Sequence, residues 1–314
     1  MENKVAVIAV GGNSLILDKT KTSMADQMVA VEETCRHLAD MVQEGWTIVV
    51  THGNGPQVGF GLRRCEMSQS EVPMMPLDGI GAETQGNIGY MIQQCLKNEL
   101  RRRGVEKDVV ACITQSEVDA NDPAFQNPTK PIGSFMDEAE AKKHEAEDGW
   151  VIVEDAGRGW RRVVASPIPT KIVEEPVLKQ LVDNGVLVVS TGGGGIPVVK
   201  DEQGCYKGVA AVIDKDFGSA LLAAAIDADL FMISTAVPRV CLNFNKPDQK
   251  ELDVCTVEEI KKYDAEGHFA KGSMAPKINA VLNYMKWGGK EAIITCPEEI
   301  VKALKGESGT KIVK

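Results

Sequence analysis

The sequence predicts an α/β fold in which helices cover both faces of a mainly parallel sheet and a small subdomain protrudes. Apolar strands alternate with amphipathic helices along most of the 314 residues, and this alternation is typical of parallel sheets. Three of the strands run directly into glycine-rich turns. Residues 119–165 are instead rich in Pro, Asp, Glu and Lys and have no sustained period, which indicates an excursion outside the core.

Strand–helix–strand units account for the first part of the chain. In the first helix, apolar residues recur at alternating steps of four and three from Met24 to Val42, and Gly45 ends the pattern. A second long helix closes at Gly104. The expected elements are the strand Lys4–Val10, the helix Met24–Val42, the strand Thr47–Thr51, the helix Gly81–Arg103 and the strand Asp108–Thr114.

Regular elements resume after the excursion. A hairpin is expected where Val198–Lys200 and Cys205–Lys207 flank a four-residue polar turn. A soft boundary near residue 210 is expected to separate two lobes. The other expected elements are the helices Ile172–Asn184, Asp216–Ile226, Ala275–Trp287 and Glu298–Leu304 and the strands Val186–Ser190, Leu230–Ser234 and Glu291–Thr295.

Charge and cysteine content narrow the class of protein. The net charge is −10 and no basic stripe offsets it, which argues against a nucleic-acid surface. The eight cysteines form no CxxC, so we expect free thiols in a reducing compartment rather than disulfides or a zinc site. No apolar run reaches membrane-spanning length and no signal peptide precedes the first strand. We therefore expect a cytoplasmic protein.

The three glycine-rich turns predict a site for an anion. Glycine lets backbone approach a ligand closely, and free N–H groups beside helix N-termini bind anions. Each glycine also raises the cost of folding, by roughly 0.5–1 kcal/mol relative to alanine, so a ligand in contact with backbone would explain the run Gly192–Gly195. The turns are Gly11-Gly12-Asn13-Ser14, Thr51–Gly59 and Ser190–Gly195. A phosphorylated or carboxylated small molecule is the expected ligand.

Three lysines are candidates for contact with that anion. Lys215 and Lys277 lie in the first turns of expected helices, where a cation opposes the helix dipole. Lys130 lies in a proline-flanked loop of the excursion. The alternative for each is an ordinary solvated lysine. Asp214 and Asp216 flank Lys215 and are placed to orient it, and His52 is equally suited to contact a ligand or to pack.

Other catalytic signatures are missing from the sequence. No GxxxxGK[ST] occurs, which excludes a P-loop enzyme. The spacing from Gly53 through Gly55 to Gly59 is one residue too long for GxGxxG, which disfavours a dinucleotide site. None of the four histidines belongs to a recognisable nucleophile–base arrangement.

The order of these motifs resembles that of carbamate kinases, within the amino-acid kinase superfamily, along nearly the whole chain. By that resemblance the protruding segment with its lysine separates this branch from others. The matching segments are Gly11-Gly12-Asn13, Thr51–Gly59, Pro128–Gly133, Asp155–Gly159, Ala211–Asp216, Asn243–Pro247 and Met274–Lys277.

The resemblance implies an open three-layer α/β/α sandwich in a homodimer. Residues 1–210 would form the acceptor lobe, including the protruding subdomain at about 119–165, and residues 211–314 the nucleotide lobe. The implied reaction is reversible phosphoryl transfer between ATP and carbamate, giving ADP and carbamoyl phosphate. The family often uses it to make ATP during fermentative breakdown of arginine or related nitrogen compounds.

The resemblance also implies roles for single residues. Mg²⁺ would be held mainly by the nucleotide phosphates and water, with no firm protein ligand. Lys130, Lys215 and Lys277 would hold phosphoryl oxygens, and Asp216 would position the lysines. The residues implied for carbamate and the transferred phosphoryl are Gly11, Gly12, Asn13, Gly53 and Asn54. Those implied for the nucleotide are Asp214, Ser234, Ala236, Val240, Met274 and Ala275.

Several positions depart from the family pattern, and other functions stay open. Ser14 and Asn245 replace a usual alanine and glycine, while Gly79 and Glu83 are unusual near the expected acceptor pocket or dimer surface. One alternative is a kinase for a larger carboxylate such as an acylated amino acid, although such chains normally lack the protrusion. A catalytically silent nucleotide or anion sensor is a second alternative, and a dinucleotide-dependent dehydrogenase is a distant third.

Overall fold

The computed structural model describes residues 4–12, 15, 16, 18, 20–154 and 157–314. Its central feature is a mainly parallel sheet in the order β15-β17-β16-β12-β1-β2-β9-β3. Only the β16–β17 pair within that sheet is antiparallel. The strands are β1 (Lys4–Val10), β2 (Trp46–His52), β3 (Val109–Ala111), β9 (Leu187–Val189), β12 (Leu230–Ser234), β15 (Val254–Thr256), β16 (Ala292–Thr295) and β17 (Thr310–Val313).

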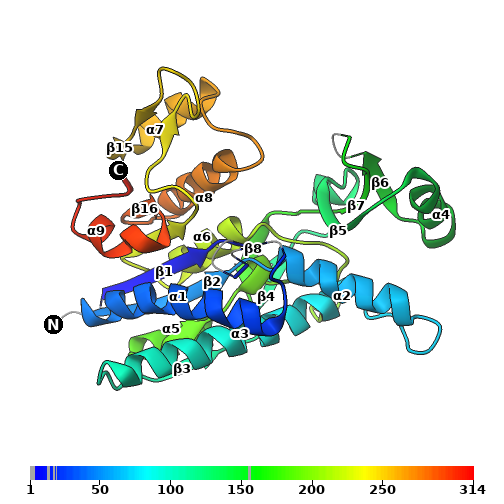
Figure 1. Ribbon diagram of the computed structural model, residues 1–314, viewed down its shortest axis with the longest axis horizontal. Helices are drawn as coiled ribbons and strands as arrows, with labels where there is room; N and C mark the ends of the chain where they lie inside the picture. The colour runs from blue at the N-terminus through cyan, green and yellow to red at the C-terminus, as the bar shows by residue number, and fades with distance from the viewer. Residues whose placement is uncertain (1–3, 13–14, 17, 19, 155–156) are drawn as a thin grey trace.

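Helices cover both faces of this sheet, as the sequence predicts, and the result is a three-layer arrangement (Figure 1). Alternate residues of β1 belong to opposite cores: Val5 and Val7 pack with α5, α6, α7 and α8, whereas Ala6 and Ile8 pack with α1, α3 and α9. The helices are α1 (Met24–Gln43), α3 (Leu77–Arg102), α5 (Glu175–Asp183), α6 (Lys215–Ala225), α7 (Val257–Ala265), α8 (Met274–Lys286) and α9 (Ile300–Leu304).

The second glycine-rich turn opens a further helix that the sequence analysis missed. This helix, α2 (Gly55–Ser68), begins with Pro56 in its first turn. It buries Val58 and Leu62 against Ile80 of α3. Glycine and proline made the segment resemble a loop, whereas tertiary packing stabilises it as a helix.

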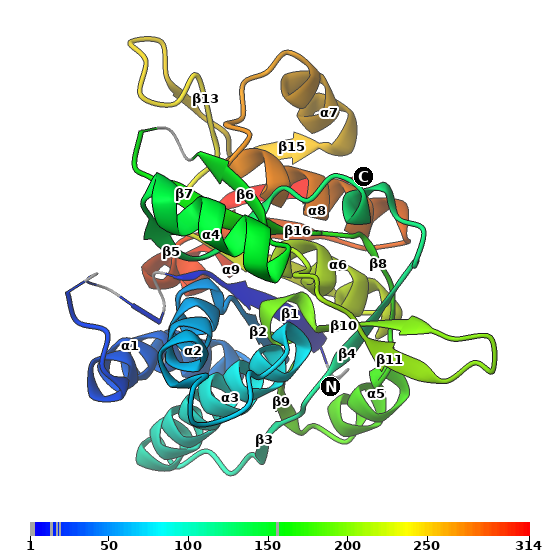
Figure 2. The same cartoon turned by 90° about the vertical axis from the view of Figure 1, so that its right-hand side faces the viewer.

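The protruding subdomain is confirmed as an excursion, but it is more regular than the sequence indicates. It contains β5 (Lys130–Met136), α4 (Glu138–Asp148), β6 (Val151–Glu154) and β7 (Trp160–Val164), with the strands paired antiparallel in the order β5-β7-β6. Ile132 and Val164 anchor it on Leu62 of α2. Figure 2 shows α4 and this small sheet lying beside the main body.

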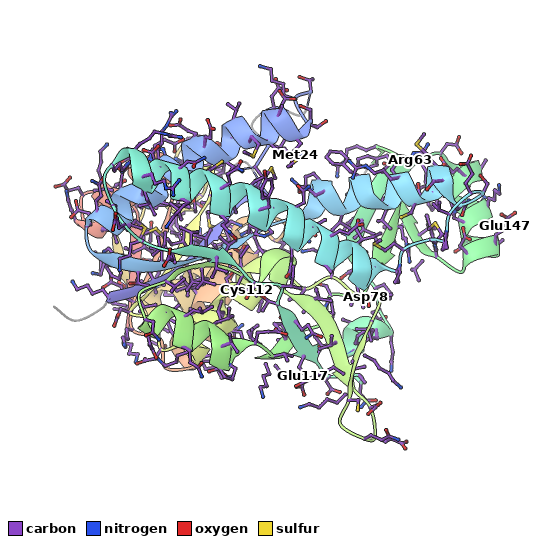
Figure 3. All side chains as sticks on the ribbon, turned by 90° about the horizontal axis from the view of Figure 1, so that it is seen from below. Met24, Arg63, Asp78, Cys112, Glu117 and Glu147 are labelled. Carbon is purple, nitrogen blue, oxygen red and sulfur yellow. The ribbon has the colours of Figure 1, made fainter. Side chains whose placement is uncertain are left out.

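A second sheet has the strand order β11-β10-β4-β8. It contains the predicted hairpin, formed by β10 (Ile196–Lys200) and β11 (Tyr206–Gly208). The other two strands are β4 (Gln115–Val118) and β8 (Pro169–Ile172), and Figure 3 shows Glu117 of β4 below the main body. The short elements β13 (Cys241–Leu242), β14 (Lys250–Glu251), η2 (Pro123–Phe125), η3 (Gly192–Gly194) and η4 (Pro297–Glu299) complete the described chain.

The two predicted lobes share the central sheet. Strands before residue 210 form one side of it and strands after residue 210 form the other, and they meet where β1 pairs with β12. All eight cysteines are free, and Cys205 is exposed. Among the described residues, no helix is both long and apolar enough to cross a membrane.

Candidate active site

The candidate site lies at the carboxyl edge of the central sheet. β12, β1, β2 and β9 are neighbours there, so the turns that follow them meet at one edge. Gly11 and Gly12 follow β1, Gly53 follows β2, and Ser234 ends β12. The predicted Asn13 lies outside the described residues. The prediction that the three glycine-rich turns share one edge is confirmed for the described residues.

Asp216 joins two of the predicted lysines at this edge. Its side chain is 4% exposed, and its two carboxylate oxygens accept separately from Lys215 and Lys277, the latter at 3.0 Å. Burial alone would raise the pKa of Asp216, but the charges of both lysines outweigh it and hold that pKa below its usual value. The carboxylate therefore stays ionised and fixes two ammonium groups side by side.

The third lysine reaches the same place from the protruding subdomain. Lys130 begins β5, and its Nζ donates to Asp214 Oδ2 at 3.0 Å. Asp214 is also the N-cap of α6, because its other oxygen accepts from the Asp216 N–H at 3.0 Å. Residues 84 positions apart are thus connected directly, and the start of α6 links all three lysines.

Gly53 and Asn54 follow β2, and Gly53 lies next to the Lys215 side chain. A Cβ on Gly53 would lie 3.4 Å from Lys215 Cδ, so the lysine stem crosses bare backbone. Asn54 Nδ2 donates to Thr84 Oγ1 at 2.9 Å, and its side chain packs against Gly193. Asn54 precedes α2 without capping it. The free N–H groups in the first turn of α2 therefore offer an anion site.

The quadruple glycine has a structural reason that differs from the predicted ligand contact. All four residues are buried, and a side chain on any of them would collide with protein atoms. Gly192 packs on His52, Gly194 on Ile213 and Gly195 on Ser116. These glycines allow α6, β2 and β4 to approach one another, and they position Lys215 indirectly.

His52 packs within the protein, which resolves the alternative left open by the sequence. It is 1% exposed, and its Nδ1 donates to the Gly53 carbonyl oxygen at 3.0 Å. The pKa of His52 is lowered to about 4, mainly by burial; the hydrogen bond to Gly53 opposes this effect and the charge of Lys215 adds to it. The imidazole is therefore neutral at pH 7.

This buried imidazole predicts a loss of stability in mild acid. Below pH 6.5 the unfolded chain protonates His52 while the folded chain resists it until about pH 4, so stability falls as the pH decreases through that window. Between pH 7 and pH 5 we expect wild type to lose about 2 kcal/mol more than His52→Asn. Urea unfolding of both proteins at the two pH values measures this difference, and equal losses would contradict it.

Two cavities adjoin the lysine cluster and share Thr235, Ala236 and Lys277. One has about 380 Å³ and is lined by Gly11, Gly12, Lys215 and Ser234 among others. The other has about 490 Å³ and extends under α8. Its further lining residues include Asp214, Asp216, Phe244, His268, Phe269 and Met274.

Four of the six residues predicted to bind the nucleotide line these cavities, and two do not. Asp214, Ala236 and Met274 line the larger cavity and Ser234 lines the smaller one. Val240 is 0% exposed in the core, and Ala275 packs against the same core. Neither is among the residues that line the two cavities.

The sequence analysis missed the aromatic wall of the larger cavity. Phe244, Phe269 and His268 lie there, and His268 Nδ1 lies 3.0 Å from Asn243 Oδ1. His268 therefore lines the cavity, a role for which the sequence analysis did not single it out. Phe244 lies inside Asn243–Pro247, one of the segments that carry the family resemblance, and this position could have indicated its place at the cavity.

The carboxylates of the site are engaged by protein groups. Both oxygens of Asp216 accept from lysines, and those of Asp214 accept from Lys130 and from backbone. Among the described residues, no group of three or more His, Cys, Asp or Glu side chains could hold a metal ion. A metal at this site would therefore depend on oxygens that a ligand brings.

Such an arrangement suits the transfer of a charged group more than proton abstraction. Two aspartates at the start of α6 bind three ammonium groups, and Lys215 among them lies beside Gly53, next to the N-terminus of α2 and the neutral, buried imidazole of His52. Cations and backbone N–H groups stabilise the oxygens of a transferring phosphoryl group.

Comparisons with known proteins agree with this geometry. The pattern of the amino acid kinase family matches residues 4–296. A carbamate kinase of Thermococcus kodakarensis is 50% identical, with 99% of each chain covered. A carbamate kinase-like protein of Escherichia coli is 49% identical, again with 99% of each chain covered. A solved structure, carbamate kinase from Giardia lamblia bound to AMP-PNP, has a TM-score of 0.94 at 43% identity and covers 100% of this chain and 99% of its own.

Identity of this extent over complete chains reaches well beyond a shared fold. The protruding subdomain is included in the match, because the alignment with the Giardia structure covers the whole of this chain. The chain therefore belongs to the amino acid kinase family, as an enzyme of its carbamate kinase branch.

Proposed function

We propose that this protein transfers a phosphoryl group reversibly between ATP and carbamate, producing ADP and carbamoyl phosphate. The observation that carries the proposal is the buried Asp216 holding Lys215 and Lys277 together beside the glycine turn after β1. Relatives named carbamate kinase at about 50% identity support the choice of acceptor.

The proposed mechanism needs no general base. Carbamate already carries an anionic oxygen, so the barrier comes from bringing two anions together and from charge on the transferred phosphoryl group. Lys215 and Lys277 would hold phosphoryl oxygens, and Lys130 would close the site from the subdomain. Gly11, Gly12, Gly53 and the N-terminus of α2 would supply N–H donors to the acceptor side. Asp216 would act as the positioning residue for the two lysines it binds.

The nucleotide would occupy the larger cavity. Phe244 and Phe269 offer surfaces for a base, and Asp214, Ala236 and Met274 line the path toward the lysines. Mg²⁺ would arrive on the ATP phosphates, since the nearby carboxylates are engaged by protein donors. It would supply charge neutralisation between the phosphates and the incoming anion.

The family resemblance also supports the setting of the reaction. We propose a cytoplasmic homodimer that makes ATP from carbamoyl phosphate during fermentative breakdown of arginine or related nitrogen compounds. The division into an acceptor lobe before residue 210 and a nucleotide lobe after it belongs to the same proposal, and the two halves of the central sheet support it.

The decisive experiment is ATP formation from carbamoyl phosphate, ADP and Mg²⁺, with acetyl phosphate as a matched donor. We expect fast ATP formation with carbamoyl phosphate only, and loss of the reaction when Mg²⁺ is chelated. If the protein binds ADP but produces no ATP from carbamoyl phosphate, the proposal is wrong. A kinase for a larger carboxylate or a nucleotide sensor would then take its place.

A further inference from the structure

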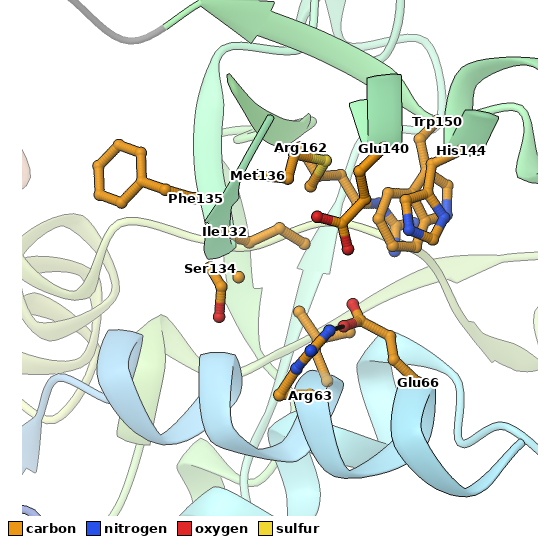
Figure 4. Close-up of a pocket in the computed structure, with 12 residues that line it drawn as sticks. Arg63, Glu66, Ile132, Ser134, Phe135, Met136, Glu140, His144, Trp150 and Arg162 are labelled. Atoms are coloured by element: carbon orange, nitrogen blue, oxygen red, sulfur yellow. Dashed lines mark hydrogen bonds and ion pairs between the residues drawn. The ribbon is translucent and has the colours of Figure 1, made fainter. Parts of the chain in front are cut away.

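A separate cavity lies between the protruding subdomain and the main body. It measures about 150 Å³, several times the space that one ordered water needs. One wall is α2, with Leu62, Arg63 and Glu66, and the other is the subdomain (Figure 4). None of the lysines or aspartates of the candidate active site lines it. Figure 3 labels Arg63 on α2, near the subdomain residue Glu147.

The cavity contains a cation, Arg162, that feels the charges of Asp148 and Glu66 without a direct ion pair among the described residues. The Arg162 guanidinium lies over the Trp150 ring, 4.5 Å from its centroid, and burial lowers the Arg162 pKa against the pull of Asp148 and Glu66. Within residues 4–12, 15, 16, 18, 20–154 and 157–314, the Arg162 guanidinium makes no hydrogen bond or ion pair, although its backbone belongs to the β5-β7-β6 sheet. A partly desolvated guanidinium without a partner is costly, and a bound carboxylate would satisfy its planar donors.

The same cavity is lined by the carboxylate of Glu140, an exposed residue. Figure 4 shows the Glu140 carboxylate pointing into the space from the start of α4. Among the described residues the Glu140 carboxylate has no ion-pair partner within 4.0 Å. Glu66, by contrast, is neutralised by Arg63 at 3.2 Å. Arg162 and Glu140 thus face one space without touching each other.

We propose that this cavity binds a small α-amino acid as its zwitterion. The ligand's carboxylate accepts from Arg162, and its ammonium donates to Glu140. The rest of the lining is mixed, with Arg63, Glu66, Ser134 and His144 beside an apolar part formed by Leu62, Ile132 and Met136, and this part suits a short aliphatic side chain. A ligand carrying only one charge would form a charge-assisted hydrogen bond with either Arg162 or Glu140, but not with both.

The position of the cavity gives such a ligand a structural role. It touches β5 and β7 of the subdomain and α2 of the body at once. β5 begins at Lys130, and α2 begins beside Asn54. A ligand in this cavity would therefore contact both β5 and α2, and each of these elements begins at the candidate active site.

Isothermal titration calorimetry on the full protein tests the proposal with L-valine, 3-methylbutanoate and 2-methylpropylamine. These probes carry both charges, the carboxylate alone and the ammonium alone. We expect saturable binding of L-valine and at least about tenfold weaker binding of either singly charged probe, since each lost charge pair costs on the order of a factor of ten or more. No saturable heat with L-valine up to about 10 mM, or equal binding of 3-methylbutanoate, would overturn the proposal.

Matched variants separate the cavity from the rest of the subdomain. Arg162→Gln and Glu140→Gln are expected to weaken L-valine binding at least about tenfold. Arg158→Gln and Glu138→Gln are the controls, because neither residue lines the cavity: Arg158 lies over Phe135, and Glu138 pairs with Lys142. Thermal melts confirm that each variant is folded. Unchanged affinity in both cavity variants, or equal losses in the controls, would contradict the assignment.

Discussion

Replacing Lys215 by alanine is expected to lower kcat by about 10²- to 10³-fold, the usual cost of removing one preorganised donor to transition-state charge. The Lys215 ammonium is held by buried Asp216, and its stem crosses Gly53, so no other group can take its place. The measurement is the initial rate of ATP formation from carbamoyl phosphate and ADP.

The fold is expected to survive this substitution. Lys215 is on the first turn of α6, and alanine is a good helix former. Asp216 keeps Lys277 as a partner at 3.0 Å. Lys142→Ala is the matched control, because Lys142 is an exposed lysine paired with Glu138 on the subdomain. A Lys215→Ala enzyme with near-normal turnover would remove this residue from the mechanism.

Replacing Gly194 by alanine is expected to be among the most destabilising single changes in this chain. Gly194 has φ +88°, where a Cβ is strained. The added Cβ would also lie 2.8 Å from Ile213 Cγ2 and 2.9 Å from the Ile213 carbonyl oxygen. We expect a loss of about 3–5 kcal/mol in the free energy of unfolding, the sum of backbone strain and overpacking.

Gly204→Ala carries the backbone strain without the overpacking, so the difference between the two variants measures the overpacking. Gly204 has a similar φ of +80° in the β10–β11 turn, but a Cβ there meets nothing within 4 Å. It should cost only about 1–2 kcal/mol. Urea unfolding of both variants provides the comparison, and activity should fall only in Gly194→Ala, because Ile213 immediately precedes Asp214 and Lys215. If Gly194→Ala and Gly204→Ala were equally destabilised, the side chains around η3 would have moved to accept the added Cβ, and the predicted overpacking would be wrong.

Local sequence patterns were sufficient to predict the main strands of the central sheet and the long helices that cover it. The strands β1, β2 and β12 and the helices α1, α3, α6 and α8 lie within a few residues of their predicted bounds. Each is long or strongly periodic, and its turn residues stand at its ends. The segments α2, α7 and the strands of the subdomain were not predicted, because their stability comes from partners distant in sequence. β5 pairs with β7 across about thirty residues, and a four-residue strand such as β6 carries too few residues to show a period.

The sequence by itself determined the fold class, and it singled out the glycine-rich turns and three lysines as candidates for an anion site. It did so because glycine-rich turns and lysines in the first turns of helices are local features of the chain, whereas the strand order that brings the ends of β1, β2 and β9 to one edge belongs to the tertiary structure. Only the tertiary structure decided which acid each lysine meets: Asp216 holds Lys277 from 61 positions away, and Asp214 holds Lys130 from 84. It also decided that Gly192–Gly195 serve packing, since the space around a glycine depends on side chains that fold against it from elsewhere in the chain.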